Sequence, residues 1–555
     1  MTLDSFRFTT LAAVVAATVV TALQPSTVGA QQTTAAAPSA QVATRKFGDL
    51  AEGPYRRLVI QNVMVIPGHG GPPTGPYDVL IEGNTISQMV AFDPVTAERR
   101  GGAQRMTGDR TIDGTGKYLM PGMIDLHMHL RTAPMEIDYV YYLKLAHGVT
   151  GIVPAPDRGL DSALVDQRRS AANEILAPRI WPIFGWGAKT SFTREQLEDT
   201  AMAPRIAAEM AKQGMRVVSL GSVTWNERLF GAVAKATWGA GGITTIHLPP
   251  STISVVNALK AACLGATMIE HHYGYAESSL PRATQDFGRE YNYDNENHRF
   301  RYAGKVWGEA DRERLLGVVA DSMAKCGVTM LPTRVVYEAN RDVLRAVGLP
   351  WNEKYTHQAL WKWNQPDPAW HGAFHYDWTS DDEYYWTQGF RLWGDLIYEF
   401  NKRGGRVAYG TDDNYIWATP GFSNVRELQL LRETGMHSLE VIKAATLNSA
   451  QTIREPRLGL VRPGYLADLV LVDGNPAYNL KFMYSFGDLT LDKDGKMFRT
   501  KGIVHTIKDG VVIDNEKMMS AVEAMVAKSK QGVDPAMSMT APFLIAPTPR
   551  SGGKP

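Results

Sequence analysis

Residues 119–130 read LMPGMIDLHMHL and begin a series of apolar runs that recurs toward residue 450. The apolar run of this stretch is typical of a buried strand, and Pro121-Gly122 predicts a turn that leads into it. His127 and His129 lie two residues apart at the end of the run, so the two-residue period of a strand directs both imidazoles to one face. Two imidazoles on one face can share a metal ion. In a chain with 13 histidines such pairs also arise by chance, so the rest of the sequence has to decide.

Seven further apolar runs follow between residues 120 and 450, and segments with helical periodicity separate them. They read VTGIVPA, RIWPIFGW, MRVVSLGS, ITTIHLP, ATMIEHH, VTMLPT and RVAYGT. Strands that alternate with helices predict parallel βα units, and eight strands close a (β/α)8 barrel. The predicted fold class is α/β, a TIM-like (β/α)8 barrel with its active residues at the carboxyl ends of the strands.

Both ends of the chain show short alternating strands broken by glycine turns. Residues 58–66, LVIQNVMVI, precede the barrel, and residues 459–473, GLVRPGYLADLVLVD, follow it. Such runs predict antiparallel hairpins. We expect the two ends to build one small composite β-sandwich domain.

These patterns give the predicted domain boundaries. They are a signal peptide at 1–30, a linker at 31–54, the N-terminal segment of the β-sandwich at 55–118, the metal-dependent barrel at 119–455 with an insertion at about 281–400, the C-terminal segment of the β-sandwich at 456–520 and a C-terminal tail at 521–555. Seven of the 13 tryptophans lie in this insertion between Trp351 and Trp393. It either packs its own aromatic side chains or covers the site as a lid.

The first 30 residues indicate export. Arg7, an apolar run at 8–23 and the small residues before Gln31 are typical of a secretory signal peptide. The alternative is an uncleaved anchor, but the run is shorter than the ~20 residues that span a bilayer. We expect an exported, periplasmic or secreted protein with no membrane span after signal removal.

The composition excludes some functions. The chain has 58 Lys+Arg against 57 Asp+Glu, so no sequence-wide field draws it to nucleic acid. The two cysteines, Cys263 and Cys326, are too few for a disulfide framework or a cysteine-based metal cluster. Any metal must therefore be held by histidines and carboxylates.

Histidines and a carboxylate also stand at the ends of other predicted strands. His247 ends ITTIHLPP, His271 ends MIEHH, and Asp412 follows RVAYGT. Imidazole is a good ligand for zinc, iron or nickel, and a carboxylate can bind metal and hold a proton. Because a barrel gathers its strand ends around one axis, we expect these residues to converge with His127 and His129.

In the order of its motifs the chain resembles the amidohydrolase superfamily of metal-dependent hydrolases, in its imidazolonepropionase and prolidase-like branch. The similar motifs are, in order, PGMIDLHMH, HGVTGIV, TTIH, GATMIEH, YGTDD and GLVRPGYLADLVLVDGNP. The similarity covers about residues 57–280 and 318–515. The resemblance implies a role at each strand end: His127 and His129 as first-strand ligands, His247 as the fifth-strand ligand, His271 as a ligand or substrate contact, and Asp412 as ligand and proton shuttle.

One family feature is missing. Members with two ions carry a carboxylated lysine near the end of strand four, where residues 214–219 here read GMRVVS. Since Ser219 cannot bridge two cations, we expect one divalent metal per chain, zinc. The alternative is a second ion bridged by a carbamate on Lys189, after the third strand.

The sequence thus predicts an exported amidohydrolase that cleaves a peptide-like or cyclic amide C–N bond with metal-activated water. Asp412 would take the proton of the water, and His271 would assist at the carbonyl. The alternatives are lactone or ester hydrolysis or decarboxylation at the same site, or a non-catalytic binding protein on the same fold.

The substrate is less defined. Tyr337, Trp186 and Trp225 follow strand ends and would line the pocket or pack at its rim, and Arg334 would anchor an acidic group or pair with a carboxylate. The aromatic insertion favours a small-molecule or short-peptide substrate with an apolar or aromatic group. A homo-oligomer is also compatible with the sequence.

Overall fold

The computed structural model describes residues 44–93, 95, 105–130, 135–365, 375 and 377–532. The predicted signal peptide, most of the predicted linker and the tail from residue 533 lie outside the described residues. The domain boundaries given above for those segments stay predictions.

Two parallel sheets contain all eight predicted strands, the third of which is divided in two. The first sheet has the order β10-β9-β8, with β8 Met123–His129, β9 Val149–Ala155 and β10 Arg179–Ile180. The second runs in chain order through β11 Ile183–Gly185, β12 Val217–Ser219, β13 Ile243–Ile246, β14 Met268–Glu270, β15 Thr329–Leu331 and β16 Arg406–Val407. Strands such as β13 and β14 are buried along their whole length, as parallel strands covered on both faces are.

Backbone hydrogen bonds join β8 to the segment that follows β16. The N–H of Leu126 donates to the carbonyl of Tyr409 at 2.9 Å, and the N–H groups of Thr411 and Asp412 donate to the carbonyl of His127 at 3.0 and 2.7 Å. The first and last predicted strands therefore present their carboxyl ends at the same place.

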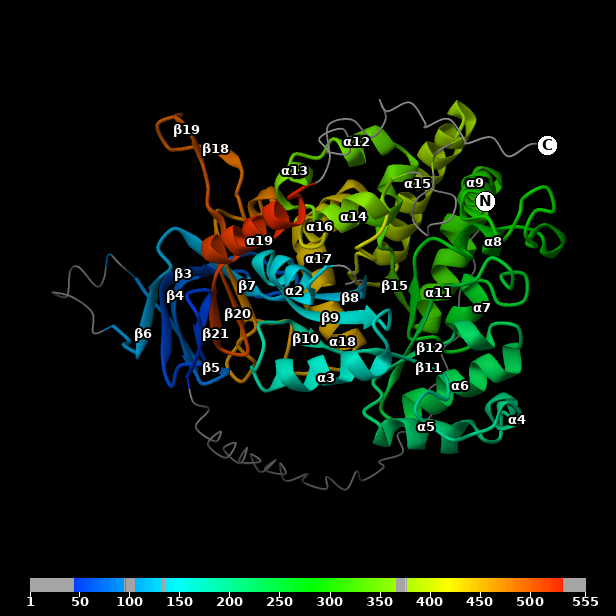
Figure 1. The fold of residues 1–555 in the computed structure, drawn as a ribbon, viewed down its shortest axis with the longest axis horizontal. Helices are drawn as coiled ribbons and strands as arrows, with labels where there is room; N and C mark the ends of the chain where they lie inside the picture. Colours follow the sequence, from blue (N-terminus) through cyan, green and yellow to red (C-terminus); the bar gives the residue numbers. More distant parts are fainter. Residues whose placement is uncertain are drawn as a thin grey trace, which may run out of the picture. The chain divides into compact units, whose positions relative to one another are not determined.

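Helices connect and surround these strands (Figure 1). Those between the strands are α2 Ile137–Ala146, α3 Leu160–Ala171, α4 Arg194–Glu198, α5 Ala203–Lys212, α6 Glu227–Gly239, α7 Ala258–Cys263 and α11 Ala320–Cys326, followed after β16 by α16 Phe422–Glu433, α17 Ser438–Lys443, α18 Ser449–Thr452 and α19 Asn515–Ser529. The side chains of Ile206, Ala207 and Met210 show the pattern, because they lie on one face of α5 and are all buried.

The region predicted as an insertion is mostly helical where the structure describes it. Its helices, with the short α8 before them, are α8 Tyr275–Ser279, α9 Glu296–Glu309, α10 Arg312–Arg314, α12 Val343–Val347, α13 Asn352–Tyr355, α14 Gln358–Trp363 and α15 Ser380–Lys402. Trp386 and Trp393 of α15 are buried, so aromatic side chains form much of the core of this region.

Strands from both ends of the chain pair in one ten-stranded sheet, where the blue and orange strands of Figure 1 lie side by side. Its order is β1-β2-β21-β20-β17-β7-β3-β4-β5, with β6 beside β3. The bounds are β1 Arg45–Phe47, β2 Ala51–Gly53, β3 Leu58–Val65, β4 Thr74–Glu82, β5 Thr85–Ala91, β6 Arg110–Asp113, β7 Lys117–Pro121, β17 Leu469–Asp473, β20 Gly502–Lys508 and β21 Val511–Asp514. A separate hairpin comprises β18 Leu489–Leu491 and β19 Met497–Arg499.

Two boundaries differ from the prediction. Strands β1 and β2 lie within the segment predicted as a linker, because this short hairpin pairs with β21. Helix α19 continues to Ser529, nine residues into the predicted tail, because Val522 and Val526 are buried.

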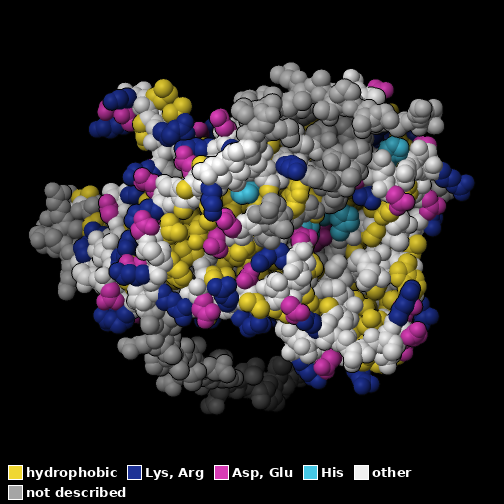
Figure 2. All heavy atoms as spheres, viewed as in Figure 1, with side chains coloured by type: hydrophobic (Ala, Val, Ile, Leu, Met, Phe, Trp, Pro, Cys, Tyr) yellow, Lys and Arg dark blue, Asp and Glu magenta, His cyan; other side chains and the backbone are white. Residues whose placement is uncertain are grey.

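Charges of both signs are interspersed over the face shown in Figure 2. This agrees with the near-zero net charge of the sequence. Among the described residues, no helix is both long enough and apolar enough to span a bilayer.

We predict that one ion network stabilises the packing of β10 against the ten-stranded sheet. Arg179 donates from Nε to Asp468 at 2.8 Å and from Nη2 to Asp509 at 2.5 Å. Arg179→Met leaves two carboxylates without their cation, so we expect the free energy of unfolding to fall by about 3–5 kcal/mol in urea titrations. Lys325→Met, which removes an exposed pair with Asp321, is the control and should change nothing measurable. Equal effects in the two variants would contradict the prediction.

Candidate metal centre

Three candidate ligand atoms meet where β8 ends and the chain leaves β16. The Nε2 atoms of His127 and His129 lie 3.3 and 2.9 Å from Oδ1 of Asp412. These three residues form one of two described groups of His and acidic residues whose ligand atoms lie within 4.8 Å of one another. The convergence predicted for these three residues is present.

Each of the two imidazoles has a carboxylate on its other nitrogen. Nδ1 of His129 is 2.7 Å from Oδ2 of Asp157, and Nδ1 of His127 is 3.0 Å from Oε1 of Glu270. A carboxylate at Nδ1 fixes the proton on that nitrogen and leaves the Nε2 lone pair for a metal. Two such imidazoles and a carboxylate are a donor set that fits a divalent, zinc-like ion.

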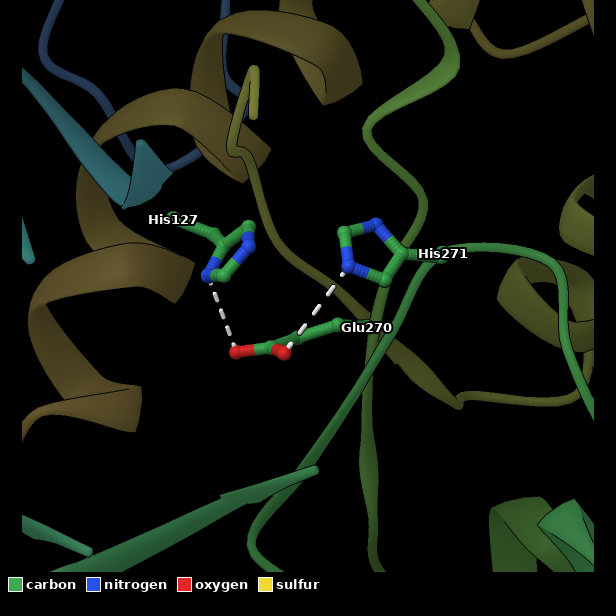
Figure 3. Close-up of side chains that lie close together, drawn as sticks. All are labelled: His127, Glu270 and His271. Atoms are coloured by element: carbon green, nitrogen blue, oxygen red, sulfur yellow. Dashed lines mark ion pairs between the residues drawn. The ribbon is translucent and has the colours of Figure 1, made fainter. Parts of the chain in front are cut away.

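Glu270 and His271 are neighbours in the chain, yet both face the site (Figure 3). Figure 3 shows the Glu270 carboxylate between the rings of His127 and His271, and these three residues form the second group of converging ligand atoms. Oε1 of Glu270 also accepts a hydrogen bond from the Thr245 hydroxyl. We therefore assign Glu270 mainly as the partner of His127.

Backbone conformation explains how adjacent residues share the site. His271 has φ of 64° and Asp412 has φ of 54°, a left-handed conformation that side chains other than glycine rarely adopt. This breaks the alternation of a strand at the point where β14 ends. Such strained residues concentrate at functional sites, where the surrounding structure holds them in place.

His271 is held through its Nδ1 atom. Its Nδ1 lies 2.8 Å from Oγ1 of Thr333 and 3.5 Å from Oδ2 of Asp412. The ring of His247 packs against it with centroids 4.7 Å apart, but His247 is not part of either described group of converging ligand atoms. The structure thus places His247 at the site without placing it among the ligands.

The electrostatics favour a cation. Burial lowers the pKa of His271 to about 3, so this imidazole is neutral at neutral pH. Burial opposes charge on His127, but Glu270 and Asp412 outweigh it and raise the pKa of His127 well above its usual value, so a metal ion at Nε2 would take the place of a proton. Burial likewise opposes charge on Glu270, yet the His127 charge holds the Glu270 pKa at about 2. Glu270 and Asp412 therefore concentrate negative charge around the histidines.

The site opens into a cavity of about 500 Å³. Its lining includes the candidate ligands and also Ser219, His247, Tyr273 and Tyr337. Ser219 stands at the end of β12, where the expected lysine is missing, and Tyr337 lies where the sequence predicts a substrate contact.

The two tryptophans predicted as substrate contacts do not line this cavity. The indole N–H of Trp186 donates to the carbonyl of Leu197, which turns the ring toward α4. Trp225 is 48% exposed, and its N–H donates to the carbonyl of Ser222. Both follow strand ends, but local hydrogen bonds direct them away from the site.

Two cationic residues also lie outside the cavity lining. The Arg334 guanidinium is buried over the ring of Phe390, 3.9 Å from its centroid, and one N–H donates to the carbonyl of Phe390. Lys189 pairs with Asp161 at the surface. The structure therefore supports neither an Arg334 anchor nor a Lys189 carbamate.

A buried lysine lies beneath the ligands. Nζ of Lys144 is 2.7 Å from Oδ2 of Asp125 and 2.6 Å from Oδ2 of Asp413, and all three side chains are fully buried. Asp125 in turn accepts the backbone N–H groups of Thr411 at 3.0 Å and His127 at 3.3 Å. Lys144 thus neutralises Asp413 and Asp125, and Asp125 holds the backbone on both sides of the site.

We predict that Lys144→Met weakens metal binding by about 10-fold or more, as loss of outer partners of ligands does. The matched control is Lys508→Met, because Lys508 is also buried but contacts Ser170 and Asn173 instead. Both variants should lose stability, whereas only the first should lose zinc affinity in chelator competition below its unfolding temperature. Unchanged affinity in Lys144→Met would show that the lysine serves stability alone.

Comparisons with known proteins support the resemblance. Residues 396–513, which include Asp412, match the amidohydrolase family. Ochratoxinase of Aspergillus niger is 37% identical over 106 residues, which are 18% of this chain and 21% of that protein. The match therefore spans about a fifth of the length of this curated relative.

Solved structures match over a larger share of the chain. A Xaa-Pro dipeptidase with bound methionine gives a TM-score of 0.53 at 17% identity, covering 82% of this chain and 100% of that chain. Bottromycin amidohydrolase gives 0.56 at 18% identity, covering 87% and 92%. At such identities the structures show the mixed α/β fold alone. With the sequence matches, they confirm the resemblance predicted from the motifs.

Proposed function

We propose that this chain, which belongs to the amidohydrolase superfamily, hydrolyses an amide C–N bond in a small-molecule or short-peptide substrate. The observation that carries the proposal is the arrangement of His127 and His129. Each ring has a carboxylate at Nδ1 and turns Nε2 toward Oδ1 of Asp412.

His127, His129 and Asp412 would hold one divalent ion, and this donor set favours zinc. When bound, such an ion supplies a hydroxide nucleophile at neutral pH and polarises the scissile carbonyl. Ser219 in place of the bridging lysine supports one ion per chain.

The two oxygens of Asp412 would have different roles. Oδ1 faces the two ligand histidines, whereas Oδ2 lies 3.5 Å from Nδ1 of His271. Oδ2 can therefore take the proton of the attacking water and pass it to the leaving nitrogen. His271, neutral because it is buried, can donate an N–H hydrogen bond to the substrate carbonyl without losing its proton.

We infer that the two parallel sheets are portions of one (β/α)8 barrel. The hydrogen bonds of Leu126 and His127 to the segment after β16 support closure on one side, and the short connection from β10 to β11 supports it on the other. The ten-stranded sheet would then correspond to the composite β-sandwich.

We also propose that the chain is exported. Cys263 at the end of α7 and Cys326 at the end of α11 form a disulfide, and disulfides persist mainly in oxidising compartments. In protein isolated from its native cells, an alkylating reagent under denaturing conditions should leave both cysteines unmodified until a reductant is added. Two reactive thiols in freshly isolated protein would argue for a reducing compartment.

The function is tested by comparing two histidine variants. Zinc-supplemented wild type should hold about one ion per chain and release carboxylic acid from N-acyl amino acids. His129→Gln should lose the ion and lower kcat/KM by more than about 100-fold. His505→Gln is the control, because His505 bonds the Ile513 carbonyl in the ten-stranded sheet and does not line the cavity. Elemental analysis and product release are the measurements.

A His129→Gln protein that keeps both zinc and activity would contradict the proposed metal site. Two ions in the wild type would overturn the single-metal proposal.

A further inference from the structure

Helix α9 contributes a charged face to the cavity. Glu296, Arg299 and Phe300 all line it. Their spacing of three and four residues places them on one side of a helix. Among the described residues that line the cavity, Arg299 is the only lysine or arginine.

This face of α9 is held firmly. The Asn295 side chain accepts the N–H of His298 at the start of the helix, and the buried Asn297 bonds the Trp378 indole at 2.5 Å. The carbonyl of Phe300 accepts the indole N–H of Trp386 at 2.7 Å. The helix is therefore fixed before any ligand enters, which lowers the entropic cost of binding.

The Arg299 guanidinium lies at the cavity, and its contacts engage only some of its N–H donors. Nη1 donates to the carbonyl of Tyr293 at 3.2 Å, and Nη2 lies 4.0 Å from Oε1 of Glu296. A guanidinium has five N–H donors in a planar fork that matches a carboxylate. These two contacts orient Arg299 and leave donor capacity for a ligand.

The acidic residues of the lining limit where an anion can bind in the cavity. Glu270, Glu296 and Asp412 are the acidic residues of the described lining, so a carboxylate near them alone would be repelled. Phe300, Tyr273 and Tyr293 add apolar and aromatic surface to the lining. A substrate that combines a carboxylate with an aromatic group fits this distribution.

We propose that Arg299 binds a free carboxylate of the substrate and makes the enzyme selective for N-acyl amino acids or peptides with an aromatic residue beside the scissile amide. This rests on the proposed amide hydrolysis. Arg299 is a specificity-determining residue here and takes no part in the proton transfers.

The test compares N-benzoyl-L-phenylalanine with N-benzoyl-L-phenylalaninamide, which lacks only the charge, and follows benzoate release. Wild type should favour the acid through KM. Arg299→Met should lower kcat/KM for the acid by about 10- to 100-fold and leave the amide nearly unchanged. Arg299→Lys, which keeps the charge without the fork, should lie between them.

Arg301→Met is the matched control on the same helix. Its guanidinium lies 3.4 Å from Asp377 and 3.1 Å from Asp382 and does not line the cavity. This variant should keep the wild-type preference for the acid. A preference that survives in Arg299→Met, or is absent in wild type, would overturn the carboxylate site.

The outcomes separate the two proposals. Cleavage of both compounds at equal rates supports the hydrolase and rejects the Arg299 site. If wild type cleaves neither, the same pair is titrated into the zinc-supplemented protein by calorimetry. Binding of the acid that weakens in Arg299→Met then supports the carboxylate site while the proposed function fails, and binding that does not distinguish acid from amide rejects both.

Discussion

The buried contact of Lys144 with Asp125 and Asp413 is the constraint on which the site depends. Asp125 accepts backbone N–H groups from both the first strand and the segment after the last one. Two carboxylates in a dry interior would repel each other, and the ammonium of Lys144 between them removes that repulsion. The relative position of His127 and Asp412 is therefore set by charges that never reach solvent.

On this base the ligands are oriented by successive layers of partners. Asp157 and Glu270 fix the rings of His129 and His127 through Nδ1, and the Thr245 hydroxyl fixes Glu270 in turn. Each layer removes a rotational freedom that a metal ion would otherwise have to restrict. The left-handed backbone at His271 belongs to the same arrangement, because it brings a sixth-strand residue to the site without displacing Glu270.

Much of this was predictable because strand ends can be recognised locally. Apolar runs that end in or precede His or Asp identified His127, His129, His271 and Asp412, and the eight apolar runs together indicated the parallel strands. The alternation of side chains along a strand also agrees with Asp413, which faces away from Asp412 and contacts Lys144.

The partners could not be found in the same way. Strict alternation turns Glu270 away from a site that contains His271, and only the positive φ of His271 brings both residues in. Lys144 lies in a helix, where nothing in the local sequence shows that its charge is buried. Arg299 belongs to a region without strand pattern, whereas Arg334, which does follow a strand, is directed into the aromatic core. Tertiary packing decides these cases.

Helix α9 lies between β14 and β15 in the chain and carries none of the candidate ligands. The candidate ligands and the proposed carboxylate contact thus lie in separate stretches of the sequence. An exchanged or lengthened segment between these two strands would alter the proposed carboxylate contact and leave the candidate ligands unchanged. The helix would therefore be the segment to replace in order to change the proposed selectivity.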